Sequence, residues 1–264
     1  LSFATPEILS IPEETIVQFK HEAAELMLYD FYLRDILRIK PHILSGEQEE
    51  LLADAGEIAE APDNIFSMFN NADIKFPEIE DENGEKVRIT HGRYGQLLES
   101  MDRRVRREAF EGVYATYQSF RNTLAAAFSS NVKQEAFFAK ARKYRSTMER
   151  ALDGGNIPVE VYTNLIAAVH ENMHLMHRYV SLRKRLLGVE ELHMYDLYTP
   201  LVADVKMEIP FEEAKQVVAK GLEPLGEEYQ KILMEGYTHR WIDVYENENK
   251  RSGAYSWGAY GTHP

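Results

Sequence analysis

The stretch from Asp102 to Tyr144 reads DRRVRREAFEGVYATYQSFRNTLAAAFSSNVKQEAFFAKARKY. Apolar residues recur in it every three or four positions, which is the spacing of one face of an α-helix. We predict two amphipathic helices here, which meet near Ser129 and Ser130. A segment of this length and pattern indicates a protein built mainly from helices.

Other segments repeat this pattern and carry signals for helix ends. Pro41 ends the first expected helix, whose acidic first turn and basic last turn suit the helix dipole. Ser45 begins the next helix with a capping box. Pro158 lies in the first turn of a long helix that ends at Gly188, and Pro224 interrupts the last helix. The expected helices span residues 12–40, 45–61, 63–72, 158–187 and 211–237.

Two short segments do not have the helical pattern. Asn83-Gly84 lies between short alternating runs in IKFPEIEDENGEKVRIT (74–90), and this dipeptide favours the turn of a β-hairpin. The tail from Asn249 to Pro264, NKRSGAYSWGAYGTHP, predicts a strand and a turn. The sequence therefore predicts a mainly α fold: an array of amphipathic helices with a small β-hairpin and a C-terminal strand.

Charge and composition exclude several classes of function. The 264 residues include 30 basic and 43 acidic side chains, which give a net charge of −13. This charge argues against nucleic acid and anionic membranes as partners. The lack of cysteine excludes disulfides, thiol catalysis and thiolate-bound zinc. No run of apolar residues is long enough for a membrane helix, and the first ten residues do not resemble a signal peptide. We therefore predict a cytoplasmic protein.

The segment from His170 to His174, HENMH, matches the H-E-x-x-H pattern of zinc peptidases. Histidines four residues apart lie on one side of a helix and can bind the same zinc ion, while Glu171 can deprotonate the zinc-bound water. With about 100° between successive residues, however, His170, His174 and His177 fall on a polar arc of a helix that is otherwise mostly apolar. This position indicates a solvated surface rather than the shaped cavity of a catalytic zinc site.

A third zinc ligand is missing near this match. Val180 occupies the position where the extended pattern has its third histidine. Glu190 and Glu191 follow Gly188, outside the helix. Because a catalytic zinc site needs three protein ligands, we interpret HENMH as surface residues. We predict no catalytic residue and no metal ligand within this chain.

Four segments carry a family resemblance. They are residues 106–144, HRYVSLRKRLLG (177–188), LHMYDLYTPL (192–201) and, most specifically, KRSGAYSWGAYGTHP (250–264). Together they resemble oligoendopeptidase F, a family of zinc metallopeptidases in the thimet oligopeptidase group. The resemblance covers essentially the whole chain. It implies that the helices belong to a larger thimet-oligopeptidase-like fold.

The resemblance also implies an activity and a cofactor for the full-length enzyme. It implies a zinc metalloendopeptidase that hydrolyses short peptides inside a cavity enclosed by helices. The zinc ligands and catalytic residues of that family are expected beyond Pro264, so this chain is expected to be an internal fragment that is inactive alone. Residues 1–100 are expected to form an N-terminal helical region with a hairpin near residues 75–90. Residues 101–264 are expected to begin the catalytic domain.

The tail provides the only candidate substrate-binding residues, and they are Gly253, Ala254, Tyr255, Ser256 and Trp257. The resemblance places them in a small sheet beside the zinc. Small residues let a peptide backbone approach closely, and an exposed sheet edge can pair with that backbone. The alternative interpretation is a buried strand that packs between helices and does not contact substrate.

Two other functions remain open. The chain can be a helical binding or scaffold module without chemistry of its own, or a self-contained zinc hydrolase that uses His170, Glu171 and His174. A second H-E-x-x-H helix encoded after Pro264 would exclude the scaffold module. Metal analysis of the purified chain tests the zinc hydrolase.

Overall fold

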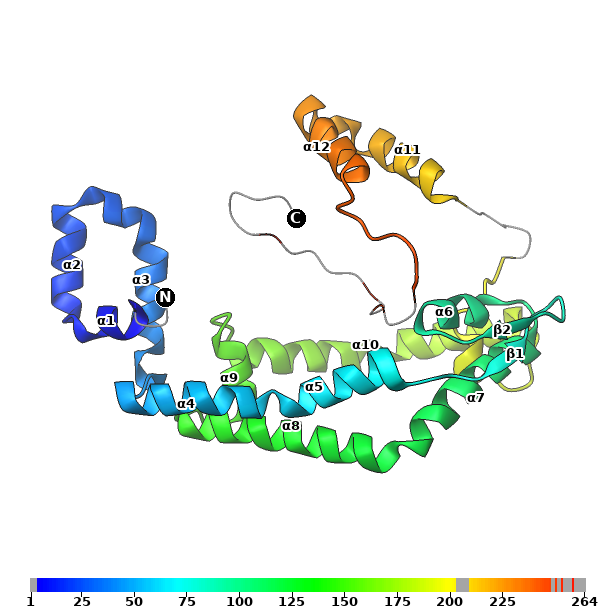
Figure 1. The fold of residues 1–264 in the computed structure, drawn as a ribbon, viewed down its shortest axis with the longest axis horizontal. Coiled ribbons are helices and arrows are strands. Elements are labelled where there is room, and N and C mark those ends of the chain that lie inside the picture. Colours follow the sequence, from blue (N-terminus) through cyan, green and yellow to red (C-terminus); the bar gives the residue numbers. More distant parts are fainter. Residues whose placement is uncertain (1–3, 203–208, 248–249, 251–252, 254–257, 259–264) are drawn as a thin grey trace. The chain divides into compact units, whose positions relative to one another are not determined.

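A computed structural model describes residues 4–202, 209–247, 250, 253 and 258 (Figure 1). In this part of the chain nearly all regular structure is helical, and one two-stranded antiparallel sheet accompanies it. This confirms the predicted mainly α fold with a small hairpin. The predicted C-terminal strand lies mostly outside the described residues. The chain divides into two compact units, Leu1–Ser67 with Phe120–His174 and Met68–Ser119 with Leu175–Pro264.

The first unit consists of two segments of the chain, and each segment contributes helices. They are α1 (Ala4–Ser10), α2 (Glu13–Glu22), η1 (Ala24–Tyr29), α3 (Asp30–Ile39), η2 (Lys40–His42), α4 (Gly46–Ala59), most of α5 (Ala61–Met68), α8 (Arg121–Ala141), α9 (Thr147–Asp153) and the first part of α10 (Val159–Leu186).

The second unit contains the sheet and the remaining helices. They are the π-helical turn η3 (Phe69–Asp73), β1 (Glu78–Glu80), β2 (Lys86–Arg88), α6 (His91–Glu99), α7 (Arg103–Ser119), the last part of α10, η4 (Met194–Asp196), α11 (Phe211–Gly221), η5 (Glu223–Leu225) and α12 (Glu227–Thr238). Among the described helices, none has both the length and the apolar character needed to cross a membrane.

The helix predicted over residues 12–40 is wrong as a single element. The chain leaves α2 at Ala23, which has φ −125° and ψ 97°, and passes through η1 into α3. Lys20 and Asp30 form a 2.9 Å ion pair across this break. Ile16 in α2 and Ile36 in α3 are both buried. No glycine or proline marks the break. The Lys20–Asp30 pair joins two different helices, and the periodicity of apolar residues carries no information about such a contact. The break could therefore not be located from the sequence.

The long stretch from Asp102 to Tyr144 does form two helices, but they meet at Phe120 and not at Ser129-Ser130. The Ser119 hydroxyl donates to the carbonyl oxygen of Thr116 at 2.6 Å. The Thr116 hydroxyl donates to the carbonyl oxygen of Gly112 at 2.7 Å. Hydroxyl groups that bind the backbone in this way compete with helical hydrogen bonds, and here they accompany the end of α7.

The predicted local signals are confirmed at several helix ends. Ser45 and Gln48 form the capping box of α4, and α10 begins directly after Pro158. Gly188 has φ +65°, a left-handed conformation that glycine adopts without a steric penalty. Pro224 lies in the short helix that separates α11 from α12. These signals act through the local backbone, so they could be read from the sequence.

The hairpin is confirmed around Asn83-Gly84. Ile79 pairs with Val87 in the register of β1 and β2. The Asp81 carboxylate accepts hydrogen bonds from the backbone N–H groups of Asn83 (2.8 Å) and Glu85 (2.9 Å), and Gly84 has φ +81°. The connection between the strands is therefore longer than a two-residue turn, and it contains a left-handed glycine.

The hydrophobic core of the second unit lies between the hairpin region and helices α6 and α7. Its centre is formed by Ile89 and by Val105 and Ala109 of α7, which are fully or almost fully buried. A β-carbon at Gly112 would come within 2.9 Å of both Ile89 and Pro77. Glycine therefore lets α7 approach the residues on both sides of the hairpin closely. This packing supplies the partner that a two-stranded sheet needs for stability.

Ionic and aromatic contacts connect the helices of the first unit. Arg142, just after α8, donates from both terminal nitrogens to the carboxylate of Glu49 in α4, each at 2.9 Å. The His42 ring stacks on the Tyr144 ring with centroids 3.7 Å apart. Arg38 in α3 pairs with Asp153 at the end of α9. The two parallel hydrogen bonds between Arg142 and Glu49 fix both the position and the orientation of these side chains.

Candidate functional site

The HENMH match lies in the middle of helix α10. His170, Glu171 and His174 are exposed, and the His174 Nδ1 atom lies 3.0 Å from the carbonyl oxygen of Glu171 in the same helix. His177 is exposed on the same arc. These side chains therefore lie on the surface of the described part of the chain. Exposure alone does not separate them from their neighbours, because the apolar residues of this part of α10 are exposed as well.

The residues present do not fit a bound zinc ion at this position. Within the described ranges of the chain, no group of three or more His, Asp or Glu residues could hold a metal ion. His170 and His174 supply two nitrogens, and a catalytic zinc requires a third protein ligand and a ligand-orienting shell. The arrangement can therefore bind a metal only weakly, as an exposed pair of histidines.

Replacing His170 or His174 by alanine should change the free energy of unfolding of the chain by less than about 0.5 kcal/mol. Both side chains are exposed, and alanine has a higher helix propensity than histidine. Urea unfolding followed by circular dichroism measures the change. Arg183→Ala is the matched control on the same helix, because Arg183 is buried and should show a loss of at least about 2 kcal/mol. A loss above about 1 kcal/mol in either histidine variant would contradict the open-surface assignment.

The second unit contains a buried ionic cluster around Asp196. The Asp196 carboxylate, which is fully buried, accepts hydrogen bonds from Arg103 Nη2 at 3.0 Å and Arg106 Nη2 at 2.8 Å. It also accepts one from the backbone N–H of His193 at 3.0 Å. Arg183 in α10 donates to the carbonyl oxygen of Asp196 at 3.0 Å. The cluster thus fixes the segment around η4 against both α7 and α10.

The same hydrogen bonds set the charge state of Asp196. Burial raises the pKa of this carboxyl, but hydrogen bonds from Arg103, from the His193 N–H and from Arg106 outweigh burial and lower the pKa to about 2. The carboxylate is therefore ionised at neutral pH. It is fully buried among these hydrogen-bond partners, so its role is to position the chain.

Sequence reasoning did not identify this cluster. Arg103 and Arg106 lie about 90 residues from Asp196 along the chain. Arg106, Arg183 and Asp196 nevertheless fall within the segments that carried the family resemblance, residues 106–144, 177–188 and 192–201, and Arg103 lies just before the first of them. Asp196 within the mostly apolar segment LHMYDLYTPL (192–201) was the available signal.

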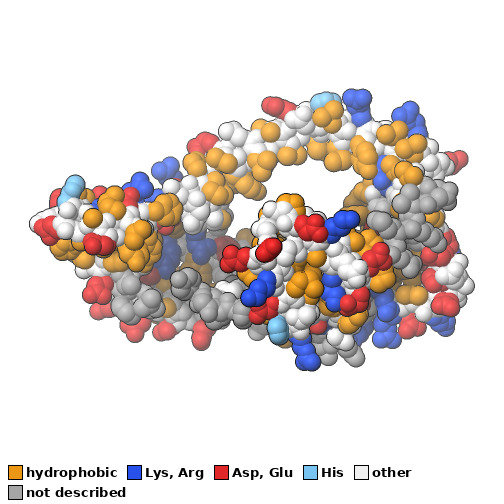
Figure 2. Space-filling view, turned by 90° about the horizontal axis from the view of Figure 1, so that it is seen from above, with side chains coloured by type: hydrophobic (Ala, Val, Ile, Leu, Met, Phe, Trp, Pro, Cys, Tyr) orange, Lys and Arg blue, Asp and Glu red, His pale blue; other side chains and the backbone are white. Residues whose placement is uncertain are grey.

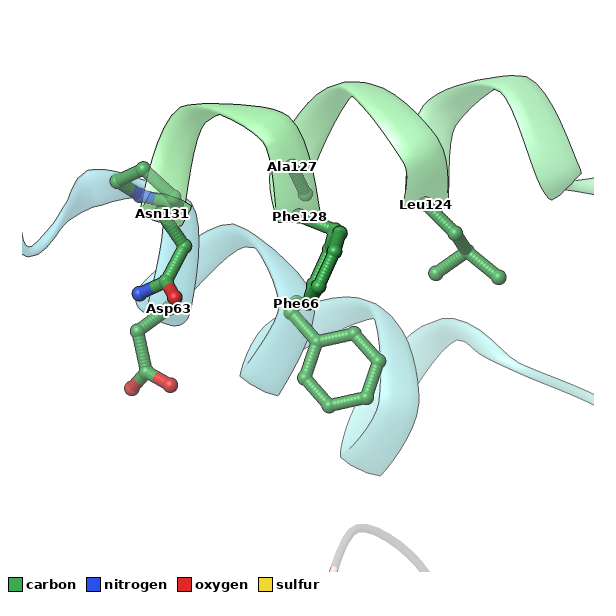
Figure 3. A pocket seen from close by; sticks show the side chains of 7 residues that line it. Asp63, Phe66, Leu124, Ala127, Phe128 and Asn131 are labelled. Atoms are coloured by element: carbon green, nitrogen blue, oxygen red, sulfur yellow. The ribbon is translucent and has the colours of Figure 1, made fainter. Parts of the chain in front are cut away.

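A cavity of about 350 Å³ lies between α5 and α8 of the first unit. In Figure 3 the side chains of Asp63 and Asn131 lie at one end, and those of Phe66 and Leu124 lie toward the other. Phe128 is 71% exposed beside it. The lining is mostly apolar and has no convergent set of polar groups, so it lacks the features of a catalytic site.

The predicted substrate-binding residues fall almost entirely outside the described part of the chain. Gly253 is described; it is exposed and has φ +117°, a conformation that favours glycine. Ala254, Tyr255, Ser256 and Trp257 lie outside the described residues. Their assignment to a peptide-binding strand stays a prediction.

Comparison with known proteins identifies the family. The model of peptidase family M3 matches residues 96–263, and the model described as oligopeptidase F matches residues 7–76. The chain belongs to peptidase family M3. The match to the first model alone covers more than half of this chain. The second match and the relatives given below confirm the resemblance to oligoendopeptidase F.

Individual relatives support the same family assignment. Oligopeptidase PepF of Bacillus subtilis is 50% identical over 263 residues, which are 100% of this chain and 39% of that protein. Group B oligopeptidase PepB of Streptococcus agalactiae is 42% identical over 99% of this chain and 43% of its own length. The crystal structure of oligoendopeptidase-F from Enterococcus faecium matches with a TM-score of 0.73 and 46% identity, over 90% of this chain and 45% of that one. The chain therefore spans about two fifths of the length of these relatives.

Proposed function

We propose that this chain forms the non-metal-binding part of a zinc-dependent oligopeptidase that hydrolyses short peptides. The observation that carries the proposal is the identity of 50% to an oligopeptidase across the whole chain, together with membership of peptidase family M3. In this proposal the zinc ligands and the catalytic glutamate belong to the part of the relatives' length that this chain does not span. We call the polypeptide of that full length the intact protein.

The helices of the chain have a role in this proposal even without a catalytic residue. They form one wall of a cavity that encloses the zinc, so that only short, unfolded peptides enter. The segment 1–100 belongs to the N-terminal helical region, and 101–264 begins the catalytic domain. The two family-model matches, one before residue 77 and one after residue 95, support this division. The enzyme acts in the cytoplasm on peptide substrates.

Hydrolysis of a short peptide by the intact protein tests the proposal. Hydrolysis should stop when a chelator removes the metal and should resume when zinc is added, because zinc generates the attacking hydroxide from bound water. The family match favours this peptidase over a helical scaffold module. Hydrolysis that persists unchanged in the chelator, or its absence from the intact protein in the presence of zinc, would contradict the proposal.

The segment 253–257 is proposed as the sheet edge that binds the peptide backbone. In the intact protein, Ala254→Val should reduce peptide turnover about tenfold or more, because the added methyl groups obstruct backbone approach and small displacements of substrate are costly. Turnover and melting temperature are measured side by side. Ala254→Ser is the matched control, because serine adds little bulk and should preserve turnover. Unchanged turnover in Ala254→Val would remove the segment from the site, and an equal loss of turnover and stability would favour a buried strand.

A further inference from the structure

The segment 241–247 of the second unit, here called the strap, lies between α12 and the proposed peptide-binding residues. It follows α12 and runs back toward α6 (Figure 1). Trp241, at its start, packs on α12, because a β-carbon at Gly236 would lie 2.9 Å from the Trp241 ring. Lys250, beyond its end, pairs with the Asp243 carboxylate at 3.0 Å and donates to the Asp243 carbonyl oxygen at 2.9 Å. Contacts near both of its ends therefore hold the strap.

The strap meets the N-terminus of α6 through the carboxylate of Glu246. A β-carbon at Gly92 would lie 3.1 Å from Glu246 Oε1 and 3.6 Å from Oε2. Gly92 is the second residue of α6, so the carboxylate lies beside the first turn of this helix. The backbone N–H groups at this end of a helix carry a partial positive charge, and an anion beside them is stabilising. Glycine at this position leaves the space that the carboxylate needs.

The sequence of α6 does not supply this anion itself. The first turn of α6 has no acidic residue, and the Thr90 hydroxyl caps it by accepting from the Arg93 N–H at 3.1 Å. A capping hydroxyl satisfies one N–H group but adds no charge. Acidic and basic side chains are interspersed on the face drawn in Figure 2, and such a mixed surface does not by itself favour one sign of charge at α6. The Glu246 carboxylate is therefore the local anion for this helix end.

The core of the second unit fixes the N-terminus of α6. His91, the first residue of α6, lies with its Nε2 atom 3.0 Å from the Tyr117 hydroxyl of α7. The His91 ring also meets the Phe76 ring edge-on, with centroids 5.1 Å apart, and Phe76 belongs to the hydrophobic core. Burial lowers the pKa of His91, and the nearby Glu246 carboxylate partly offsets this effect. The strap therefore meets a helix end that the core holds in place.

We propose that Glu246 is a positioning residue, whose carboxylate binds the N-terminus of α6 and thereby holds the chain that enters residues 253–257. This inference rests on the proposed function, which assigns those residues to peptide binding. Gly253 follows Glu246 closely along the chain, and Lys250 between them is tied back to Asp243. A fixed Glu246 therefore restricts how far Gly253 can move from α6, and this restriction prepares the segment for a peptide.

The distance between two spin labels in the intact protein tests the anchor. One nitroxide is attached at Gln96→Cys on α6 and the other at Tyr245→Cys in the strap, because both side chains are exposed. The 264-residue chain contains no cysteine of its own, and any cysteine elsewhere in the intact protein is replaced first. Pulsed electron paramagnetic resonance then measures the distribution of distances between the labels. We expect a narrow distribution when Glu246 and Gly92 are unchanged.

Two further variants should release the strap in this labelled protein. Glu246→Gln removes the charge, and the distribution should become at least about twofold wider, because a segment that loses its contacts samples many positions. Gly92→Glu should widen it as well, since a like charge then occupies the helix end, although this change favours α6 itself. Glu99→Gln is the matched control, because it removes an exposed carboxylate from the other end of α6 and should leave the distribution narrow.

Three results would overturn the anchor. They are a broad distribution when Glu246 and Gly92 are unchanged, a distribution that stays narrow in Glu246→Gln, and equal widening in the control Glu99→Gln. Because distances are measured and not hydrolysis, an intact protein without peptidase activity would refute the proposed function, and the distances would still decide whether Glu246 holds the strap.

Peptide hydrolysis by the unlabelled intact protein tests the positioning role. Glu246→Gln should raise the KM of a short peptide about two- to fivefold, as the loss of one exposed ionic contact permits. The kcat should stay nearly unchanged, because the contact acts on peptide binding and not on the reacting atoms. An unchanged KM in a variant whose strap has become mobile would show that Glu246 does not position the segment 253–257 for its substrate.

Discussion

Replacing Asp196 by asparagine should destabilise the second unit by about 3–5 kcal/mol, because it removes one partner of a buried ion pair. The remaining charge on Arg106, which is only 3% exposed, loses its carboxylate partner at 2.8 Å. The amide of asparagine also cannot accept from Arg103, Arg106 and the His193 N–H as two carboxylate oxygens do. Urea unfolding followed by circular dichroism measures the loss. Glu111→Gln, an exposed change on the same helix α7, should stay within about 0.5 kcal/mol.

The pH dependence of this effect follows from the low pKa of Asp196. Its pKa is about 2 in the folded chain, below the value of about 3.9 for an unfolded aspartate. A depressed carboxyl pKa contributes stability that is present above the unfolded value and is lost as the pH falls toward the folded value. The difference in unfolding free energy between wild type and Asp196→Asn should therefore be constant near pH 7 and should shrink between about pH 5 and pH 2. A constant difference over that range would contradict the ionised, hydrogen-bonded carboxylate.

The 264-residue chain alone should show no peptidase activity above the rate without enzyme. Enzymes accelerate reactions by factors of at least about 10⁶. We therefore expect the isolated chain to lack all of the hydrolytic activity of the intact protein. The described residues offer no three-ligand metal group, and His170 and His174 are an exposed pair. The rate is measured with a short fluorogenic peptide in the presence of zinc. Chelator-sensitive hydrolysis by the chain that disappears in Glu171→Gln would show that HENMH is catalytic after all.

The parts of the fold that the sequence predicted are those set by local backbone chemistry. Ser45 with Gln48, Pro158, Gly188 and the Asn83-Gly84 turn act on residues within a few positions of themselves, so each could be placed from the sequence. The end of α7 at Ser119 was missed. The pair Ser129-Ser130 has the same side-chain chemistry and lies inside α8, so residue type alone does not decide where a helix ends.

The features that the sequence did not predict depend on contacts between distant residues. The break at Ala23 accompanies the pairing of Lys20 with Asp30 and the burial of Ile16 and Ile36. The Asp196 cluster joins three separate segments of the chain, and periodicity carries no information about such a meeting. The candidate site residues also differ in how far the sequence alone could place them. The polar position of His170 on α10 followed from helix geometry, whereas the assignment of residues 253–257 rested on the family resemblance and stays a prediction.

The zinc content of the intact protein tests the central claim most directly. Elemental analysis is performed on three purified proteins: the intact wild type, its His170→Ala/His174→Ala double variant, and the 264-residue chain. We predict about one tightly bound zinc ion per polypeptide in both intact proteins, since a catalytic site holds one ion through three protein ligands, and no stoichiometric zinc in the chain. Loss of zinc from the double variant, or stoichiometric zinc in the chain that depends on His170 and His174, would contradict the proposal that the chain forms the non-metal-binding part of the peptidase.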